Sequence, residues 1–206
     1  MRIGIDFDNT IVCYDGIFHE VAVKRGLIPY DFPTDRESLR DHLNSTGLAD
    51  DFTRLQGFVY GPGIEQATLW PDVKDFVARA SSQGHFVCVI SHKSVRPMLG
   101  PAYQLRDYAR AFLQRSGLVG PGLIPPDSIY FEETQEAKAN RVRALEVDLF
   151  IDDLAEFLTR PDFPDETLPV LFDPSGQGQT SVNPGLRVFT DWKAISQWLL
   201  SYSKPE

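Results

Sequence analysis

Short apolar segments alternate with amphipathic segments along most of the chain, and this alternation limits the folds it can adopt. Apolar segments of this length predict β-strands, and the segments between them have the spacing of helices. Strands that alternate with helices predict a parallel sheet with right-handed crossovers and helices on both faces. We therefore expect a Rossmann-like α/β fold. The predicted strands are Met1–Ile5, His85–Ile90, Ser128–Phe131, Val147–Ile151 and Leu168–Phe172, and the predicted helices are Pro71–Ser82, Tyr103–Ser116, Lys138–Leu145 and Asp191–Leu200.

A different pattern separates the first strand from the rest of the predicted sheet. Apolar residues recur there at helical spacing, and Gly and Pro interrupt them. We expect residues 14–69 to form a small helical insert, and residues 1–13 and 70–206 to form the core domain. Three helices are predicted in the insert, over Asp15–Gly26, Arg36–Leu43 and Ala49–Phe58, and a surface loop is predicted over Asp173–Pro184.

Two acidic pairs follow apolar strands. Asp6 and Asp8 come directly after the first strand, and Asp152 and Asp153 come after the strand that ends at Ile151. The carboxyl ends of parallel strands lie at one edge of the sheet, where open α/β sheets bind their ligands. We expect these carboxylates to converge there with Ser91, which ends another strand.

Carboxylates held close together repel unless a proton or a cation lies between them. Mg²⁺ fits best because it prefers oxygen ligands and keeps waters that a phosphate oxygen can replace, whereas the dense acidic loop of a calcium site is absent from the sequence. Taken alone, the first pair could equally cap a helix. Lys138, on a predicted helix 14 residues before Asp152, could place an ammonium beside the carboxylates or could be an ordinary solvated lysine.

Together these residues resemble the four motifs of the haloacid dehalogenase (HAD) superfamily, in order and over most of the chain. The sequence Asp6-Phe7-Asp8-Asn9-Thr10 looks like the first motif, and Ile151-Asp152-Asp153 looks like the fourth. Ser91 after an apolar strand looks like the second, and Lys138 looks like the third. The resemblance implies a HAD-like core with a helical cap inserted after the first strand.

The resemblance also implies a magnesium-dependent phosphatase that hydrolyses a phosphomonoester of a small molecule through an aspartyl-phosphate. Asp6 would be the nucleophile, and Asp8 would act as general acid and then general base. A second aspartate at this position favours a phosphatase over a dehalogenase, which has no alkoxide to protonate. The implied catalytic residues are Asp6, Asp8, Ser91 and Lys138. The implied metal ligands are Asp6, the backbone carbonyl of Asp8, and Asp152, whereas Asp153 would hold the metal through water or orient Lys138.

The implied substrate is a small phosphorylated metabolite, and the cap would choose it. Lys93 and Arg96 follow the second motif and could bind a substrate anion, or could belong to a solvated basic loop. The layout of this loop is similar to that of the small 5'(3')-deoxyribonucleotidases, which makes a nucleoside monophosphate the second substrate class. A catalytically idle protein that binds a phosphorylated ligand, and a phosphomutase, are the remaining alternatives.

The composition limits the classes of molecule that the protein is expected to bind. The net charge of −9, without any block rich in Lys and Arg, argues against a nucleic-acid polymer or an anionic membrane as partner. Two cysteines are too few for a disulfide framework. We find no leader-like segment and no apolar run of about 18 residues, so we expect a cytoplasmic protein, whose oligomeric state the sequence leaves open.

Overall fold

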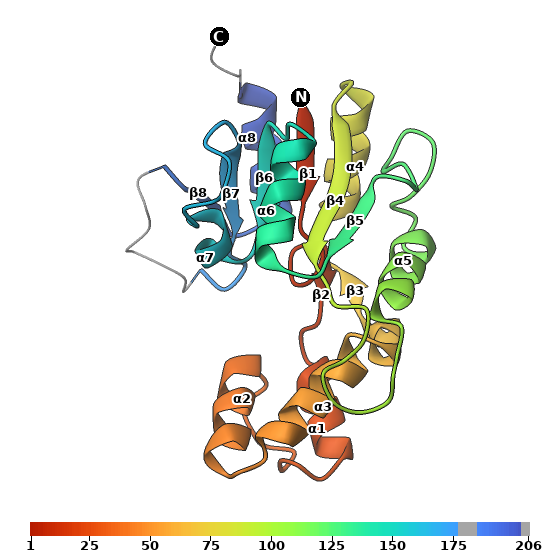
Figure 1. Cartoon of the computed structure of the whole chain (residues 1–206), viewed down its shortest axis with the longest axis vertical. Helices are drawn as coiled ribbons and strands as arrows, with labels where there is room; N and C mark the ends of the chain where they lie inside the picture. The colour runs from red at the N-terminus through yellow and green to blue at the C-terminus, as the bar shows by residue number, and fades with distance from the viewer. Residues whose placement is uncertain (177–184, 203–206) are drawn as a thin grey trace. The chain divides into compact units, whose positions relative to one another are not determined.

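The computed structural model describes residues 1–176 and 185–202. A parallel sheet with the strand order β5-β4-β1-β6-β7-β8 forms the centre of one compact unit (Figure 1). Every neighbouring pair in it is parallel, which confirms the predicted α/β class. The strands are β1 (Arg2–Ile5), β4 (Phe86–His92), β5 (Ile129–Glu132), β6 (Leu149–Asp152), β7 (Leu168–Phe172) and β8 (Arg187–Phe189).

The first strand lies inside the sheet, between β4 and β6. Ile5 pairs with Val89 on one side and with Ile151 on the other. This register brings the carboxyl ends of three strands to the same edge of the sheet. The residues that follow β1 and β6 therefore lie beside each other although they are far apart in the sequence.

Helices cover both faces of the sheet (Figure 1). On one face, α6 (Gln135–Ala144) and α7 (Ala155–Leu158) bury an apolar cluster that includes Val142, Phe150 and Phe157. On the other face lie α4 (Val73–Ser82) and α8 (Trp192–Ser201), where the rings of Phe76 and Trp192 are 4.9 Å apart. Burial on both faces explains why the middle of β4 and most of β6 are continuous apolar runs instead of alternating with polar residues.

The second compact unit comprises residues 13–68 and 93–115. The strands β2 (Val12–Cys13) and β3 (Thr68–Leu69) pair with each other where the chain enters and leaves the first of these segments. The helices of this unit are α1 (Ile17–Lys24), α2 (Arg36–Ser45), α3 (Ala49–Val59), the 3₁₀ helix η1 (Pro62–Gln66) and α5 (Leu105–Arg115).

The second unit differs in one segment from the division made on sequence. Residues 93–115 are predicted to belong with the sheet, whereas in the structure they cluster with residues 13–68. The apolar side of α5, which includes Ala109 and Phe112, is buried, and Arg115 donates a hydrogen bond to the carbonyl of Ile64 in η1. Periodicity reveals that a helix has an apolar side but not which partner covers it, and this explains the difference.

Most predicted elements are present within one to three residues of their expected ends, but the shortest ones are not predicted. The helix α7 has four residues, β8 has three, and β2 and β3 have two each. Elements this short contain too few residues to show a hydrophobic period. Of the surface loop expected over 173–184, residues 177–184 lie outside the described part of the chain.

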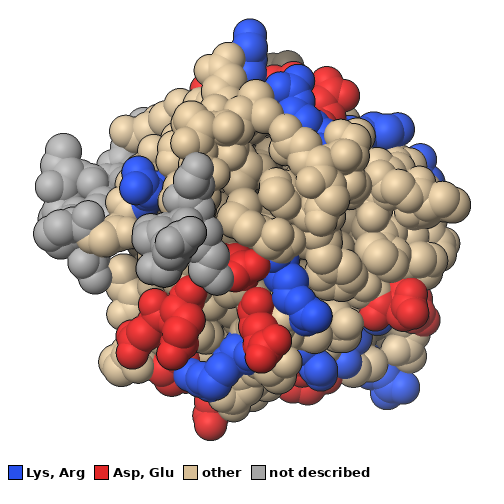
Figure 2. Space-filling model, turned by 90° about the horizontal axis from the view of Figure 1, so that it is seen from above, with Lys and Arg blue, Asp and Glu red and all other residues tan. Residues whose placement is uncertain are grey.

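Charged side chains of both signs are intermingled on the molecular face in Figure 2. Acidic and basic groups lie side by side along one margin of this face, and uncharged residues fill most of the remainder. Among the helices of the described residues, none combines the length and apolar character needed to cross a membrane.

Candidate active site

The site is built where β1 and β6 end. Asp6 directly follows β1. Its backbone N–H donates a hydrogen bond of 2.9 Å to the carbonyl of Ile151, the residue of β6 that precedes Asp152. Asp152 is the last residue of β6. Asp6 is 5% exposed and Asp152 is fully buried, so the ladder that joins the two strands also carries their carboxylates into a site largely shielded from water.

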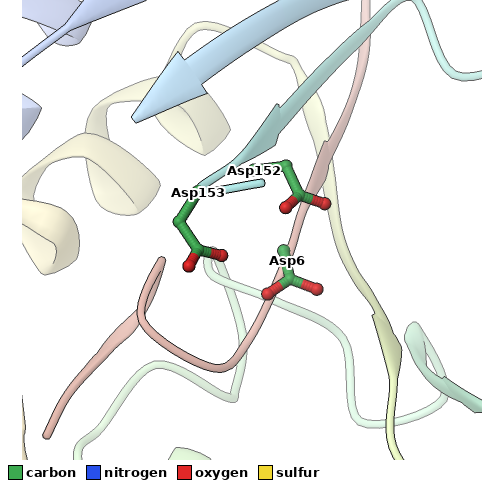
Figure 3. Close-up of side chains that lie close together, drawn as sticks. All are labelled: Asp6, Asp152 and Asp153. Atoms are coloured by element: carbon green, nitrogen blue, oxygen red, sulfur yellow. The ribbon is translucent and has the colours of Figure 1, made fainter. Parts of the chain in front are cut away.

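Three of the four carboxylates expected to converge do so at this edge of the sheet. One oxygen of each of Asp6, Asp152 and Asp153 lies within 4.8 Å of the other two. Figure 3 shows the three side chains gathered around one region, Asp6 from the segment after β1 and the other two from the end of β6. We refer to Asp6, Asp152 and Asp153 as the aspartate cluster.

Lys138 connects two members of the aspartate cluster. Its Nζ lies 2.6 Å from Oδ1 of Asp6 and 2.6 Å from Oδ2 of Asp152, and its side chain is only 2% exposed. The side chain comes from α6, whose first turn is fixed because the Thr134 hydroxyl accepts a hydrogen bond from the Ala137 N–H. The ammonium also lies 4.2 Å from the ring centroid of Phe157, within the range of a cation–π interaction.

Burial and charge shift the pKa values of this cluster. Burial raises the pKa of Asp6 to about 7; the charge of Lys138 opposes this rise and that of Asp152 adds to it. Burial, and then the charges of Asp152 and Asp6, raise the pKa of Asp153 well above its ordinary value. Burial alone would lower the pKa of Lys138, but the two adjacent carboxylates outweigh it and the pKa is raised. The lysine is therefore a permanent cation.

The hydroxyl of Thr10 holds Asp153 in place. It accepts a hydrogen bond of 3.0 Å from the N–H of Asp153 and donates one of 3.2 Å to the Oδ1 of the same residue. Asp152 is fixed in a comparable way, because its Oδ1 accepts a hydrogen bond from the N–H of Leu154. Both carboxylates at the end of β6 are thus oriented by hydrogen bonds, that of Asp153 from the distant residue Thr10 and that of Asp152 from the nearby Leu154.

Two indole groups hold the loop that follows Asp6. Trp70 Nε1 donates to the carbonyl of Asn9 at 2.8 Å, and Trp192 Nε1 donates to the carbonyl of Thr10 at 3.1 Å. Asn9 has a φ of 59°, a left-handed conformation that Asn tolerates better than most residues. The indoles satisfy carbonyl groups that this sharp turn leaves without partners in the sheet.

The aspartate cluster suits a hard divalent cation. All of its donor atoms are carboxylate oxygens, which Mg²⁺ prefers, and they come close enough together to share one ion. Burying these three carboxylates without a compensating positive charge would be costly, and the single charge of Lys138 compensates only part of their negative charge. The residues present therefore fit the predicted magnesium ion, with Asp6, Asp152 and Asp153 as its candidate ligands.

The other predicted site residues are placed as follows. Asp8 lies outside the aspartate cluster; it is half-buried and forms a backbone bridge with Val12. Ser91 is buried near the carboxyl end of β4, the strand beside β1. Lys93 and Arg96 belong to the second unit, where Lys93 is buried with its Nζ 5.1 Å from the centroid of the Tyr60 ring and Arg96 is exposed. Their roles stay predictions.

Four groups that shape the site have no role in the predictions made from the sequence. The hydroxyl of Thr10 lies within the first motif, where its spacing from Asp6 could have drawn attention to it. Phe157 lies on the unpredicted helix α7. The two indoles contact the loop from remote parts of the chain, and a single sequence carries no signal for such a contact.

Comparisons with known proteins identify the fold. No protein-family model and no curated protein matches the sequence. Solved structures do match, among them the HAD-hydrolase YfnB from Bacillus subtilis bound to magnesium, at 13% identity and a TM-score of 0.59 over 96% of this chain and 97% of that chain. D,D-heptose 1,7-bisphosphate phosphatase from Burkholderia thailandensis matches at 14% identity and a TM-score of 0.54, over 98% and 99% of the two chains. The L-2-haloacid dehalogenase RSc1362 matches at 10% identity and a TM-score of 0.57, over 97% and 98%.

These similarities confirm the HAD-like fold that the four motifs imply. They span nearly the whole chain, so the second unit is included in the match. Phosphatase and dehalogenase structures both match, which means that the fold leaves the chemistry open. The chemistry has to be argued from the residues of the site.

Proposed function

We propose that this protein is a magnesium-dependent phosphatase that hydrolyses a phosphomonoester of a small molecule through an aspartyl-phosphate. The observation that carries the proposal is the buried ammonium of Lys138, which lies 2.6 Å from both Asp6 and Asp152. A fixed cation between a candidate nucleophile and a candidate metal ligand suits a reaction in which phosphoryl oxygens need neutralisation.

In the first half-reaction, a carboxylate oxygen of Asp6 attacks phosphorus. A bond forms between this oxygen and phosphorus, and the bond from phosphorus to the ester oxygen breaks. Asp8 gives its proton to the departing alkoxide, so that an alcohol leaves. Lys138 and the hydroxyl of Ser91 interact with the phosphoryl oxygens, and Mg²⁺ when bound supplies further neutralisation of their charge.

In the second half-reaction, Asp8 takes a proton from a water molecule that attacks the phosphorus of the aspartyl-phosphate. The bond between phosphorus and the Asp6 oxygen breaks, which releases inorganic phosphate and restores the carboxylate. Asp8 is half-buried, whereas Asp6 is almost fully buried, so water reaches the residue that must exchange protons more easily than the nucleophile.

A hydrolysis assay tests the proposal. We expect release of phosphate from an aryl phosphate that depends on Mg²⁺ and is lost in Asp6→Asn. The matched control is Asp127→Asn, which removes an exposed carboxylate from a surface turn and should leave turnover unchanged. Hydrolysis that persists in Asp6→Asn would overturn the proposed nucleophile. Binding of phosphate without any turnover would favour an idle ligand-binding protein instead.

A substrate panel addresses the substrate class. Sugar phosphates, nucleoside monophosphates and small phosphorylated acids should be compared under the same conditions. We expect a small phosphorylated metabolite to be preferred, and a preference for nucleoside monophosphates would select the nucleotidase alternative. Isomerised phosphorylated product without release of inorganic phosphate would indicate a phosphomutase.

A further inference from the structure

The helix α8 contacts the active-site loop although it contributes no residue to the aspartate cluster. Its first residue, Trp192, is 1% exposed and donates a hydrogen bond of 3.1 Å from Nε1 to the carbonyl of Thr10. The two residues are 182 positions apart in the sequence. Thr10 is fully buried and lies between Asp6 and β2. A remote helix is therefore bonded directly to the loop that follows the proposed nucleophile.

The indole of Trp192 is fixed on several sides. The first turn of α8 is capped by Asp191, whose Oδ1 accepts a hydrogen bond from the Ala194 N–H. The indole packs against Phe76 of α4 and Phe172 of β7, with ring centroids 4.9 and 5.5 Å away. A large side chain in a close-packed core keeps one rotamer, so the N–H of this indole points in a constant direction.

Thr10 connects this donor to Asp153. Its carbonyl accepts the hydrogen bond from Trp192, and its hydroxyl exchanges two hydrogen bonds with Asp153, one with the N–H and one with Oδ1. A hydrogen bond to the carbonyl restricts the backbone of Thr10. Because a β-branched side chain has few χ1 rotamers, holding the backbone also holds the hydroxyl.

The two indoles that contact this loop hold different residues. Trp70 Nε1 donates to the carbonyl of Asn9, whereas Trp192 Nε1 donates to the carbonyl of Thr10, the residue whose side chain bonds to Asp153. Trp192 is therefore the indole that lies one residue away from the aspartate cluster.

We propose that Trp192 is a positioning residue for Asp153 and, through it, sets the affinity of the aspartate cluster for Mg²⁺. The indole N–H holds the backbone of Thr10, and the hydroxyl of Thr10 orients the carboxylate of Asp153. Hydrogen bonds behind a metal ligand usually tune its affinity because they fix its orientation. The link to Mg²⁺ rests on the proposed function, whereas the positioning of Asp153 is measurable in the metal-free protein.

The substitution Trp192→Phe keeps a ring against Phe76 and Phe172 but removes the N–H donor. In the metal-free protein, the amide resonance of Asp153 and its hydrogen exchange report the bond to the Thr10 hydroxyl. We expect this resonance to shift and the exchange to become about fivefold faster, which corresponds to the usual strength of one hydrogen bond. Calorimetry should show a Kd for Mg²⁺ that is about fivefold higher.

Two substitutions on the same helix are the controls. Trp198→Phe makes the same chemical change in an indole that packs against Phe189 and Tyr202. Ile195→Val removes a methyl group from a fully buried side chain, which lowers stability without removing a donor. Both controls should leave the Asp153 amide and the Kd for Mg²⁺ as in the wild type. The comparison separates positioning from a general loss of stability.

A double-mutant cycle tests the route through Thr10. Thr10→Val removes the hydroxyl and should raise the Kd for Mg²⁺ by about tenfold or more, as is usual when a partner of a metal ligand is lost. Trp192→Phe added to Thr10→Val should then change the Kd little, because the group through which Trp192 acts is gone. Fully additive effects of the two substitutions would overturn this route.

Replacement of the Trp192 indole by benzothiophene removes the N–H and keeps the ring shape, and it takes the place of Trp192→Phe if that variant does not fold. An Asp153 amide that is unchanged in the variant would overturn the inference. A shifted amide with an unchanged Kd would overturn the link to Mg²⁺. Wild-type protein that binds no Mg²⁺ would overturn the magnesium site of the proposed function, and the Asp153 amide would still decide the positioning role.

Discussion

At the scale of single residues, Lys138 largely determines the charge balance of the site. It is the partner of two buried carboxylates, and a third lies close by. Removing one partner from a buried ion pair leaves an uncompensated charge in a medium that solvates it poorly. The lysine therefore has a structural role in the metal-free protein in addition to the catalytic role we propose.

The substitution Lys138→Met should destabilise the metal-free protein by roughly 3–5 kcal/mol, because it leaves Asp6 and Asp152 buried without a cation. The loss should be smaller with excess Mg²⁺ if the aspartate cluster binds this ion. Urea unfolding with and without Mg²⁺ measures both effects. Lys193→Met, at an exposed position of α8, is the control and should change little. A loss equal to that of the control would show that the buried ion pairs do not stabilise the fold.

The raised pKa values of Asp6 and Asp153 predict a pH dependence for the metal-free protein. The folded state binds more protons than the unfolded state between the ordinary carboxyl pKa of 3.8 and the folded value of about 7 for Asp6. The contribution of Asp6 to the free energy of unfolding therefore falls as the pH rises through this window, and is constant above it; the raised pKa of Asp153 acts in the same direction.

Denaturant unfolding of the metal-free protein at several pH values between about 5 and 8 tests this dependence. Asp6→Asn should flatten the slope, because its amide does not titrate. Asp127→Asn again serves as the control. A free energy of unfolding that rises with pH throughout the window, and does so equally in Asp6→Asn, would contradict the assignment.

At the scale of elements, the central position of β1 depends on Gly4. A Cβ atom at this position would lie 2.6 Å from Cδ2 of Phe150, the residue with which Gly4 pairs in β6. Because Gly4 has no side chain, the ring of Phe150 in β6 can pack over β1. Because Asp6 follows β1 by only one residue, this packing also sets the position of the nucleophile.

The substitution Gly4→Ala should cost about 1–3 kcal/mol of stability through overpacking. The double variant with Phe150→Leu should recover part of that loss, because it removes the ring that meets the new methyl group. Thermal unfolding of the two single variants and the double variant gives the coupling between the positions. Strictly additive losses would mean that the two residues do not clash.

At the scale of the whole molecule, the chain forms two compact units, one of which is assembled from two separate segments. The helix α5 lies in the second of these segments and packs against η1 in the first. Contacts join α5 both to residues 13–68, through Arg115 and Ile64, and to its own segment, where the Leu105 N–H donates to the carbonyl of Val95. A deletion that removes the second unit must therefore remove both of its segments.

Deletion of residues 14–67 alone should leave the apolar side of α5 uncovered and produce a protein that binds hydrophobic dyes and aggregates. Deletion of both 14–67 and 94–114, with short turns at the junctions, should reduce dye binding. Dye fluorescence and light scattering compare the two variants. Equal dye binding and equal scattering by the two would contradict the division of the chain described above.

The predictability of the molecule differs between its parts for physical reasons. The strands that end beside Asp6 and Asp152 are predictable because they are continuous apolar runs. A parallel sheet places the carboxyl ends of these strands together, so the convergence of the two aspartates is predictable as well. The hydrogen bonds of Trp70 and Trp192 depend on tertiary packing, which one sequence does not encode locally. For the same reason, the sequence does not predict that α5 packs against η1.

The pairing of β1 with β6 also determines when the site comes into existence. Asp6 and Lys138 are 132 residues apart in the sequence, and Asp152 lies further still. A chain that emerges from the ribosome has its first strand long before the strand that completes the site, and pairings between distant segments form slowly. The aspartate cluster is therefore among the last features that a newly made chain acquires, and fragments that end before β6 lack it entirely.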